Sequence, residues 1–440
     1  MNGSHDRTLE KGGSQGSRAI VAASVGNAFE WYDFTVYALF AIYISKVFFP
    51  GGDSTMELVK TFLAFGLGFV VRPLGAVLLG IYGDRAGRKA VLTATIGLMA
   101  VGTGVIAFAP GYMAIGVGAP LLLLFGRILQ GFSAGGEIGG AAALLIEHAP
   151  PHRRGEYASW LQATMSASNI MGASAAFIVT ALLTQDQLES FGWRLPFIFG
   201  LLIAPIGIWI RRTLDETPEF KREIEHRRTS PIRPLKVLIE EYPFVVLKGW
   251  SLCILWTVSS YSLVIFMPTY VQRTFGYTPN QAFTASLVAN VFMVCICVLA
   301  GMASDRLGRR TVLLAAAAWL VVLVHPLLWL MQAQHSVWSL IVGQTLLGVG
   351  VGSFVGVGPS TLAELFPARV RSTGVSLSYN LAVTIFSGFA PAMLSYLTGR
   401  GVLFAPGWYV IIAAVLASPA LFTLKHGGTL FSGQGAVQPN

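Results

Sequence analysis

A ten-residue charged stretch occurs twice in this chain, and no other feature of the sequence constrains the fold as strongly. The copies span residues 80–89 and 301–310, and both follow the pattern G-x-x-x-D-R-x-G-R-(K/R). Their aspartates, Asp84 and Asp305, are 221 residues apart, about half of the 440-residue chain. Each copy is a short charged link between two long apolar runs. A repeat of this period predicts two equivalent halves.

A second repeat supports this division. Glu147 precedes Arg154 by seven residues, Glu364 precedes Arg371 by seven, and the two pairs are 217 residues apart. Three glycines recur at the same offset, namely Gly126, Gly131 and Gly135 as Gly343, Gly348 and Gly352.

The composition indicates a membrane protein. Hydrophobic residues make up 54% of the chain and charged residues only 12%, whereas globular domains are about 25% charged. Apolar runs near twenty residues, bounded by charge or by Pro and Gly, are typical of membrane-spanning helices. The sequence therefore predicts an all-α membrane protein with twelve transmembrane helices. The runs cover about residues 19–48, 58–82, 90–109, 120–146, 157–183, 193–212, 244–272, 280–303, 311–332, 336–364, 371–398 and 404–424.

The predicted organisation is two six-helix halves with polar connections. The longest internal polar segment, residues 213–243, is the expected linker between the halves at 19–212 and 244–424. Residues 1–18 are polar and rich in Gly and Ser, so we expect a tail and no signal peptide. Residues 425–440 form a second expected tail.

The net charge of +9 is explained by topology. With a cytoplasmic N-terminus, 23 of the 30 Lys and Arg residues fall inside, 5 outside and 2 within spans. This bias predicts that both termini are cytoplasmic, and it makes nucleic-acid binding an unnecessary explanation. We expect a multi-pass protein of a plasma membrane, with the lipid bilayer as its surroundings.

The first run carries polar side chains on one helical face: Asn27, Glu30, Asp33 and Tyr37. Glu30 lies 12 residues beyond Arg18, which at 1.5 Å per residue is about 18 Å, near the midplane. Ionisable groups at that depth are costly and usually functional. Desolvation and like charge make it expensive to ionise both carboxylates, so one of them is poised to take up a proton. The alternative is that both pair with a basic group for packing.

Two arginines and a third acid lie within other runs. Arg72 is 12 residues before Asp84, again at mid-depth, while Arg127 lies toward the outer side of the fourth run and Glu137 near its middle. Arg suits bidentate binding of carboxylates. We predict Arg72 as a ligand of an anionic substrate and Arg127 as the fallback. The alternative is that Arg72 is a structural partner of Glu30 or Asp33.

Uncharged polar residues at similar depth form stripes along one face of several runs. These stripes predict a polar cavity between the halves, although polar stripes also hold helices together. The candidate ligands among them are Gln162, Asn169, Tyr261 and Asn380. His325 is a reserve candidate for proton transfer. The sequence has no zinc-binding helix motif, nucleophile elbow or P-loop. We therefore expect no enzyme activity, no cofactor and no bound metal.

The doubled charged links and twelve runs resemble the major facilitator superfamily. Residues 26–34 (GNAFEWYDF), 72–75 (RPLG), 135–137 (GGE), 193–197 (WRLPF) and 214–220 (LDETPEF) resemble its metabolite:proton symporter family. Residues 110–112 (PGY) and 126–131 (GRILQG) are similar to the citrate and tricarboxylate branch. In the second half, Gln344 replaces the counterpart of Arg127. Any proton role for that arginine is thus confined to the first half.

The resemblance implies proton-coupled uptake of a small organic anion, such as citrate, by alternating access around a midplane site. The favoured proton carrier is Asp33, with Glu30 as the partner that holds Arg72. The alternatives are that these two roles are reversed or that Glu137 carries the proton. The family also includes transporters of shikimate, aromatic acids and zwitterions such as proline and betaine, which stay open as alternatives. A drug exporter, a nutrient sensor and a membrane enzyme fit less well. We expect the protein to act as a monomer in a bacterial inner membrane.

In the superfamily the charged motif latches the cytoplasmic side closed through charge pairs and helix dipoles. The same network should include the acid and base pairs of the second repeat. The predicted gate residues are Asp84, Arg85, Arg88, Glu147, Arg154, Asp305, Arg306, Arg309, Glu364 and Arg371.

Overall fold

The computed structural model describes residues 27–28, 30–86, 88–135, 137–202, 205 and 234–424. The predicted tails, residues 1–18 and 425–440, lie outside the described residues, as does the linker up to residue 233. The rest of the linker includes a short helix, α13 (Pro234–Glu241). The described residues contain helices and no strand, so the all-α prediction is confirmed.

The first half begins with a helical segment over residues 30–39. Its elements are α2 (Ala41–Phe48), α3 (Ser54–Val70), α4 (Arg72–Ala86), α5 (Arg88–Phe108), α6 (Tyr112–Ile115), α7 (Gly118–Ala134), α8 (Glu137–His148), η1 (Pro151–Arg153), α9 (Arg154–Leu182), α10 (Gln185–Ser190) and η2 (Gly192–Arg194). Helix continues from η2 to residue 202.

The second half is described without gaps from residue 234 to residue 424. Its elements are α14 (Pro243–Ser260), η3 (Tyr261–Ile265), α15 (Met267–Phe275), α16 (Pro279–Leu307), α17 (Arg309–Gln334), α18 (Val337–Glu364), η4 (Ala368–Val370), α19 (Arg371–Ala382), η5 (Val383–Ser387), α20 (Ala390–Gly399) and α21 (Ala405–Phe422). The segments η3 and η5 are π-helical turns inside the seventh and eleventh runs.

Eight helical stretches among the described residues are long and apolar enough to cross a membrane. Residues 93–108 and 192–202 form two shorter apolar helices. The remaining two predicted runs, the first and the fourth, contain residues 29 and 136, which are outside the described set. Where the structure describes the chain, its helices therefore follow the predicted apolar runs.

Helix ends are set by local sequence. Thr278 with Gln281 forms a capping box at the start of α16, and Ser336 with Ser339 forms one at the start of α18. Gly276 ends α15 with a φ of 74°, which favours a residue without a Cβ. These signals set the starts of α16 and α18 and the end of α15.

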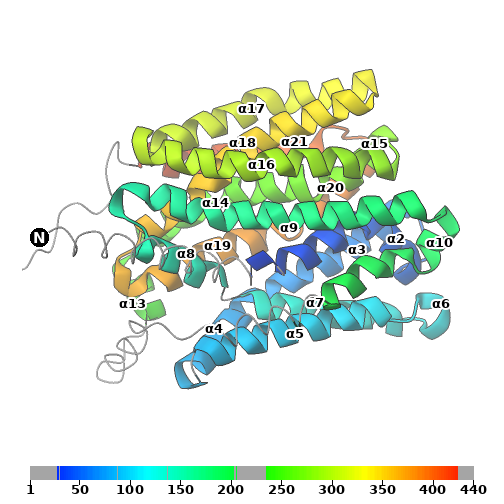
Figure 1. Ribbon diagram of the computed structural model, residues 1–440, viewed down its shortest axis with the longest axis horizontal. Helices are drawn as coiled ribbons and strands as arrows, with labels where there is room; N and C mark the ends of the chain where they lie inside the picture. The colour runs from blue at the N-terminus through cyan, green and yellow to red at the C-terminus, as the bar shows by residue number, and fades with distance from the viewer. Residues whose placement is uncertain are drawn as a thin grey trace, which may run out of the picture.

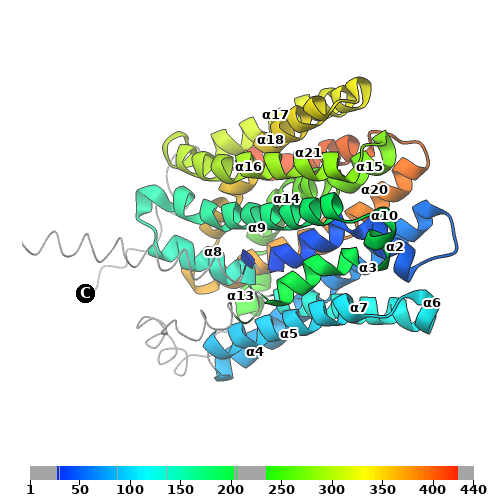
Figure 2. The same cartoon turned by 45° about the vertical axis from the view of Figure 1, so that its right-hand side comes forward.

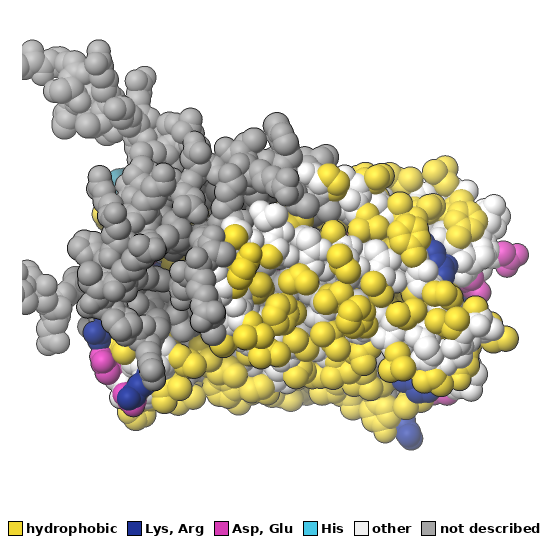
Figure 3. Space-filling model, turned by 90° about the horizontal axis from the view of Figure 1, so that it is seen from below, with side chains coloured by type: hydrophobic (Ala, Val, Ile, Leu, Met, Phe, Trp, Pro, Cys, Tyr) yellow, Lys and Arg dark blue, Asp and Glu magenta, His cyan; other side chains and the backbone are white. Residues whose placement is uncertain are grey.

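The helices run roughly along one axis of the molecule (Figures 1 and 2). In both views α9 lies beside α16, with α4, α5 and α7 on one flank and α17 and α18 on the other. Figure 3 shows a broad apolar surface whose charged side chains gather mostly at its two ends. That distribution suits a bundle surrounded by lipid.

Two ends of the bundle are distinguished below. The motif end carries the links at residues 86–88, 148–154, 307–309 and 364–371, and the opposite end carries those at 48–54, 275–279, 334–337 and 399–405. At the motif end, α9 and α16 come so close that only glycine fits. A Cβ on Gly301 would lie 2.6 Å from the carbonyl oxygen of Gly155. Gly301 is the first residue of the second charged motif, so the glycine at this position of the motif has a packing reason.

Candidate functional site

Arg72 and Glu30 form an ion pair inside the first half. Their side chains are 3% and 7% exposed. The Arg72 guanidinium also stacks on the rings of Phe34 and Phe69, 4.9 and 4.6 Å from their centroids. Burying two charges is tolerated because each satisfies the other. The Arg72 Nε has no hydrogen-bond partner, so part of this guanidinium is still available to an incoming acceptor.

Asp33, one turn further along the same helix, has a different set of partners. The Thr103 hydroxyl on α5 donates to Asp33 Oδ2, and Gln130 Nε2 on α7 donates to the same oxygen at 3.4 Å. Gln130 Nε2 also donates to Thr103 Oγ1 at 2.9 Å. Within the described part of the chain, Asp33 is thus held by two neutral donors rather than by a direct ion pair.

Arg127 is fully buried among aromatic rings. Its guanidinium carbon lies 4.7 Å from the ring centroid of Phe34 and 4.6 Å from those of Tyr37 and Phe65. Its Nη1 donates to Gln130 Oε1 at 2.6 Å, whereas its Nε and Nη2 have no hydrogen-bond partner among the described residues. Cation–π contacts compensate in part for this burial. A buried cation with two unused donors is a strong candidate for binding an anionic group.

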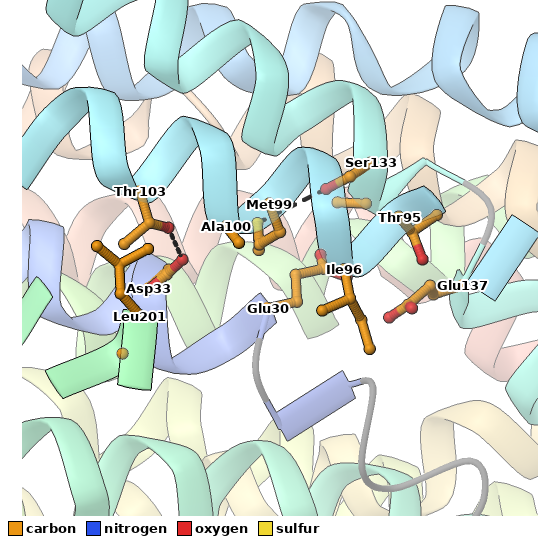
Figure 4. Close-up of a pocket in the computed structure, with 12 residues that line it drawn as sticks. Glu30, Asp33, Thr95, Ile96, Met99, Ala100, Thr103, Ser133, Glu137 and Leu201 are labelled. Carbon is orange, nitrogen blue, oxygen red and sulfur yellow. Dashed lines mark hydrogen bonds between the residues drawn. The ribbon is translucent and has the colours of Figure 1, made fainter. Parts of the chain in front are cut away.

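The three carboxylic acids share a small cavity within the first half (Figure 4). Its volume, as the space open to the centre of a water-sized sphere, is about 30 Å³, which accommodates about two waters. Glu30 and Glu137 lie close enough that their charges repel each other when both are ionised. The remaining lining residues are Thr95, Ile96, Met99, Ala100, Thr103, Ser133, Ala134, Gly200 and Leu201.

A second cavity lies between the halves and measures about 20 Å³. The first half lines it with Trp31, Gln162, Met165, Ser166 and Asn169, and the second with Trp256, Ser260, Val264, Ile265, Met293 and Tyr379. None of these side chains is charged. Neither cavity can hold an organic solute, so the halves must separate before a substrate enters.

The polar side chains predicted as ligands divide into two groups. Gln162 and Asn169 line the cavity between the halves, and the Tyr261 hydroxyl is buried without a partner. Asn27, Tyr37 and Asn380 line neither cavity. They donate instead to the backbone carbonyls of Leu161, Thr61 and Gly135, respectively.

Sequence reasoning missed three aromatic residues of the inter-half cavity. Trp31 packs edge-on against Tyr261 at 6.0 Å, and the rings of Trp256 and Tyr379 lie 5.1 Å apart. All of them lie in apolar runs, where an aromatic residue is ordinarily part of a core. The motif around Glu30 contained Trp31 but gave no reason to single it out.

The side chain of His325 contacts aromatic rings and does not line the cavity that holds Glu30, Asp33 and Glu137. Its ring packs between α17 and α21, against Trp408 at 4.6 Å and Phe404 at 6.2 Å, and beside Gly407. Arg194 stacks on Trp193 and donates to the carbonyls of Ser190 and Ala109. The surroundings of both residues are those of packing groups.

Asp305 ties the halves together at the motif end. Its two carboxylate oxygens accept from the backbone N–H groups of Gly155 and Glu156, at 2.8 and 2.9 Å, and so cap the start of α9. Arg309 pairs with Asp305 at 2.8 Å and with Glu364 at 3.1 Å. One carboxylate therefore links a helix start in one half to a charge cluster in the other.

The acid and base pairs of the second repeat are arranged across the halves. Glu147 at the end of α8 pairs with Arg371 at the start of α19, at 3.3 Å. Glu364 pairs with Arg309 and not with Arg371, and Arg154 Nε is buried without a partner. Arg306 is exposed. The side chains of Asp84, Arg85 and Arg88 lie outside the described part of the structure.

The molecule has two six-helix halves, buried charges in the first half, and charged contacts that join the halves at the motif end. These features define a membrane transporter of the secondary type. The sequence profile of the Major Facilitator Superfamily matches residues 33–302 and 292–437. The chain belongs to this superfamily, and the predicted membership and twelve-helix fold are confirmed.

Relatives agree with this assignment. The citrate-proton symporter of Klebsiella pneumoniae is 34% identical over 413 residues, 93% of this chain and 92% of that protein. The proline/betaine transporter of Escherichia coli (strain K12) is 32% identical over 418 residues, 93% of this chain and 83% of that protein. Both are transporters, which confirms the prediction that this chain is not an enzyme.

Solved structures support the fold. The proton:xylose symporter XylE bound to 6-bromo-6-deoxy-D-glucose matches with a TM-score of 0.76. The match covers 93% of this chain and 95% of that one, at 18% sequence identity. At that identity the likeness extends to architecture alone.

Proposed function

We propose that the protein is a proton-coupled symporter that takes up a small carboxylate-bearing solute by alternating access. One observation carries the proposal. Glu30, Asp33 and Glu137 line a single water-sized cavity, and two buried arginines with unused donors contact this group: Arg72 pairs with Glu30, and Arg127 is connected to Asp33 through Gln130. Carboxylic acids that can exchange a proton, next to cations that can bind an anion, are the parts that such coupling needs.

In the proposed cycle, one carboxylic acid takes up a proton when the site faces outside. A carboxylate of the solute then engages the free donors of Arg72 or Arg127. The halves, residues 19–212 and 244–424, close around both cargoes and open on the other side. The contacts that join the halves at the motif end in this structure belong to a stage of that cycle that is closed on that side.

The first candidate solute is a di- or tricarboxylate such as citrate. Two buried guanidinium groups suit anions, and the citrate-proton symporter is 34% identical over nearly the whole chain. Shikimate or an aromatic acid would use the same arginines through its single carboxylate.

A zwitterionic osmolyte such as betaine or proline is the second candidate. The cavity between the halves has no charged lining and contains Trp31, Trp256 and Tyr379. Aromatic faces attract quaternary ammonium groups through cation–π contacts. The proline/betaine transporter, 32% identical, is in keeping with this alternative.

The proposed setting is a bacterial inner membrane, with the motif end and both termini in the cytoplasm. The basic residues of the sequence support this orientation. The protein is proposed to work as a monomer, because each half supplies part of one central site.

Uptake into vesicles with an imposed pH gradient tests the function. Labelled citrate should accumulate when the outside is acidic and should stop accumulating when the gradient is collapsed. Labelled betaine, proline and shikimate are measured in the same way, and each unlabelled solute serves as a competitor for the others. Accumulation of betaine with no effect of citrate would select the second candidate, and no accumulation of any of these solutes would overturn the proposal.

A further inference from the structure

Gln130 lies between the cation and the acid that the proposed function uses. Its side chain is fully buried. The amide oxygen accepts from Arg127 Nη1 at 2.6 Å. The amide nitrogen donates to Asp33 Oδ2 at 3.4 Å and to Thr103 Oγ1 at 2.9 Å. Arg127 and Asp33 are therefore connected through one side chain that can point only one way.

The direction of the amide follows from its neighbours. A guanidinium has donors and no acceptor, so it must face the amide oxygen. An ionised carboxylate has acceptors only, so it must face the amide nitrogen. Thr103 fits the same order, since its hydroxyl accepts from Gln130 and donates to Asp33. The hydrogen bonds of Gln130 and Thr103 are therefore oriented by two charges, the positive charge of Arg127 at one end of this network and the negative charge of Asp33 at the other.

We propose that Gln130 is a positioning residue that transmits the protonation state of Asp33 to Arg127. Hydrogen bonds to an ionised carboxylate are roughly twice as strong as those to a neutral one. When Asp33 gains a proton, the bonds from Gln130 and Thr103 weaken. Gln130 then holds Arg127 less firmly against the rings of Phe34, Tyr37 and Phe65. Protonation thereby frees Arg127 to bind a solute carboxylate.

Other charged groups near Asp33 set the background for this response. Glu30 lies on the same helix, Glu137 on α8 lines the same cavity, and Arg72 on α4 pairs with Glu30. On the side of α7, Arg127 is the charged group that faces Asp33. Of these four, only Arg127 is joined to Asp33 through a described side-chain amide.

The second half offers a matched control. Gln344, on α18, corresponds to Arg127 at the offset of 217 residues. It is also a buried glutamine, 5% exposed, but its amide nitrogen has no hydrogen-bond partner. Replacing either glutamine by methionine removes a buried amide of similar size. Only Gln130→Met breaks a link between two charges.

The test measures how solute affinity depends on pH, and it rests on the proposed function. Citrate and betaine are used as probes, with exchange of internal for external solute as the assay, because exchange needs no net proton movement. In the wild type, the half-saturation constant should fall as the pH becomes more acidic. In Gln130→Met this dependence should largely disappear, a change of about tenfold at the acidic end. Gln344→Met should keep the wild-type dependence.

The outcomes are distinct. Wild-type pH dependence in Gln130→Met overturns the proposal, and so does its loss in Gln344→Met. If Gln130→Met does not reach the membrane, Gln130→Glu replaces it, because its carboxylate accepts from Arg127 but cannot donate to an ionised Asp33. The conservative Gln130→Asn should restore at most part of the dependence, since the shorter amide cannot reach both partners.

A spectroscopic measurement separates this proposal from the proposed function. The purified protein is titrated in infrared difference spectroscopy, with the Arg127 guanidinium band assigned through Arg127→Lys. The band should change as Asp33 takes up a proton in the wild type, and should stay fixed in Gln130→Met and Asp33→Asn. This result needs no solute. A guanidinium band that responds equally in Gln130→Met overturns the link even if transport is established.

Discussion

The carboxylate of Asp305 caps the backbone N–H of Gly155, although the two residues belong to opposite halves of the molecule. The cap satisfies a donor that the start of α9 cannot satisfy within its own helix. The same carboxylate is held by Arg309, which also pairs with Glu364. The contact exists only while the motif end is closed, so it stabilises that state over any open one.

Asp305→Asn should weaken closure at the motif end and slow transport. Loss of a helix cap typically costs about 0.5–2 kcal/mol, and the amide also loses the charge that attracts Arg309. Initial uptake rates should fall while insertion into the membrane stays normal. Asp84→Asn in the first motif should have the same effect. The control is Glu240→Gln, which breaks only the exposed pair between Lys236 and Glu240. Normal initial uptake rates in both aspartate variants would show that the charged motif does not act in the gate.

Gly301→Ala should interfere with the approach of α9 to α16. Its Cβ would meet the Gly155 carbonyl oxygen at 2.6 Å and the Ser159 side chain at 2.6 Å. The halves would have to move apart at the motif end, which should lower uptake. Gly140→Ala is the matched control, because a Cβ there has no neighbour within 4 Å. Equal rates in the two alanine variants would show that this close approach does not limit transport.

Arg72→Lys should weaken solute binding. Lysine keeps the positive charge but loses the planar fork and much of the stacking on Phe34 and Phe69. A charge-assisted contact is worth roughly 1.5–3 kcal/mol, so the half-saturation constant should rise on the order of tenfold to a hundredfold. An unchanged constant would assign Arg72 to its ion pair with Glu30 alone. Arg127→Lys would then be the variant to measure.

Neutralising the proton carrier should separate two activities. In Glu30→Gln, Asp33→Asn or Glu137→Gln, the carrier would be fixed in a form that resembles the protonated acid. Accumulation driven by a pH gradient should vanish, while exchange of internal for external solute survives. Asp186→Asn, at the exposed start of α10, is the control. If all three variants still concentrate solute when only a pH difference is imposed, none of these acids carries the proton.

Much of the fold could be predicted from the sequence, because apolar run length and charged links act locally. The pairing of Glu30 with Arg72 was also foreseeable, since both residues lie at similar depth in neighbouring spans. The pairing of Glu147 with Arg371 was not. The repeat identified equivalent positions in the halves, but which of them meet depends on how the halves dock. Gln130 was overlooked for a related reason. Its role depends on how its side-chain amide is oriented between Arg127 and Asp33, which depends on how two helices pack.

The location of the charges has a consequence for how membrane voltage acts on the protein. Glu30, Asp33 and Glu137 with Arg72 and Arg127 carry one net negative charge when all are ionised, and none once a proton is bound. The spans of the second half contain no Lys, Arg, Asp or Glu at mid-depth. In the proposed cycle, the electrical work of moving the loaded site is then that of the solute alone. Each charge is worth about 2.3 kcal/mol per 100 mV. A zwitterion would cross without that work, whereas uptake of a trianion would be opposed by a potential that is negative inside.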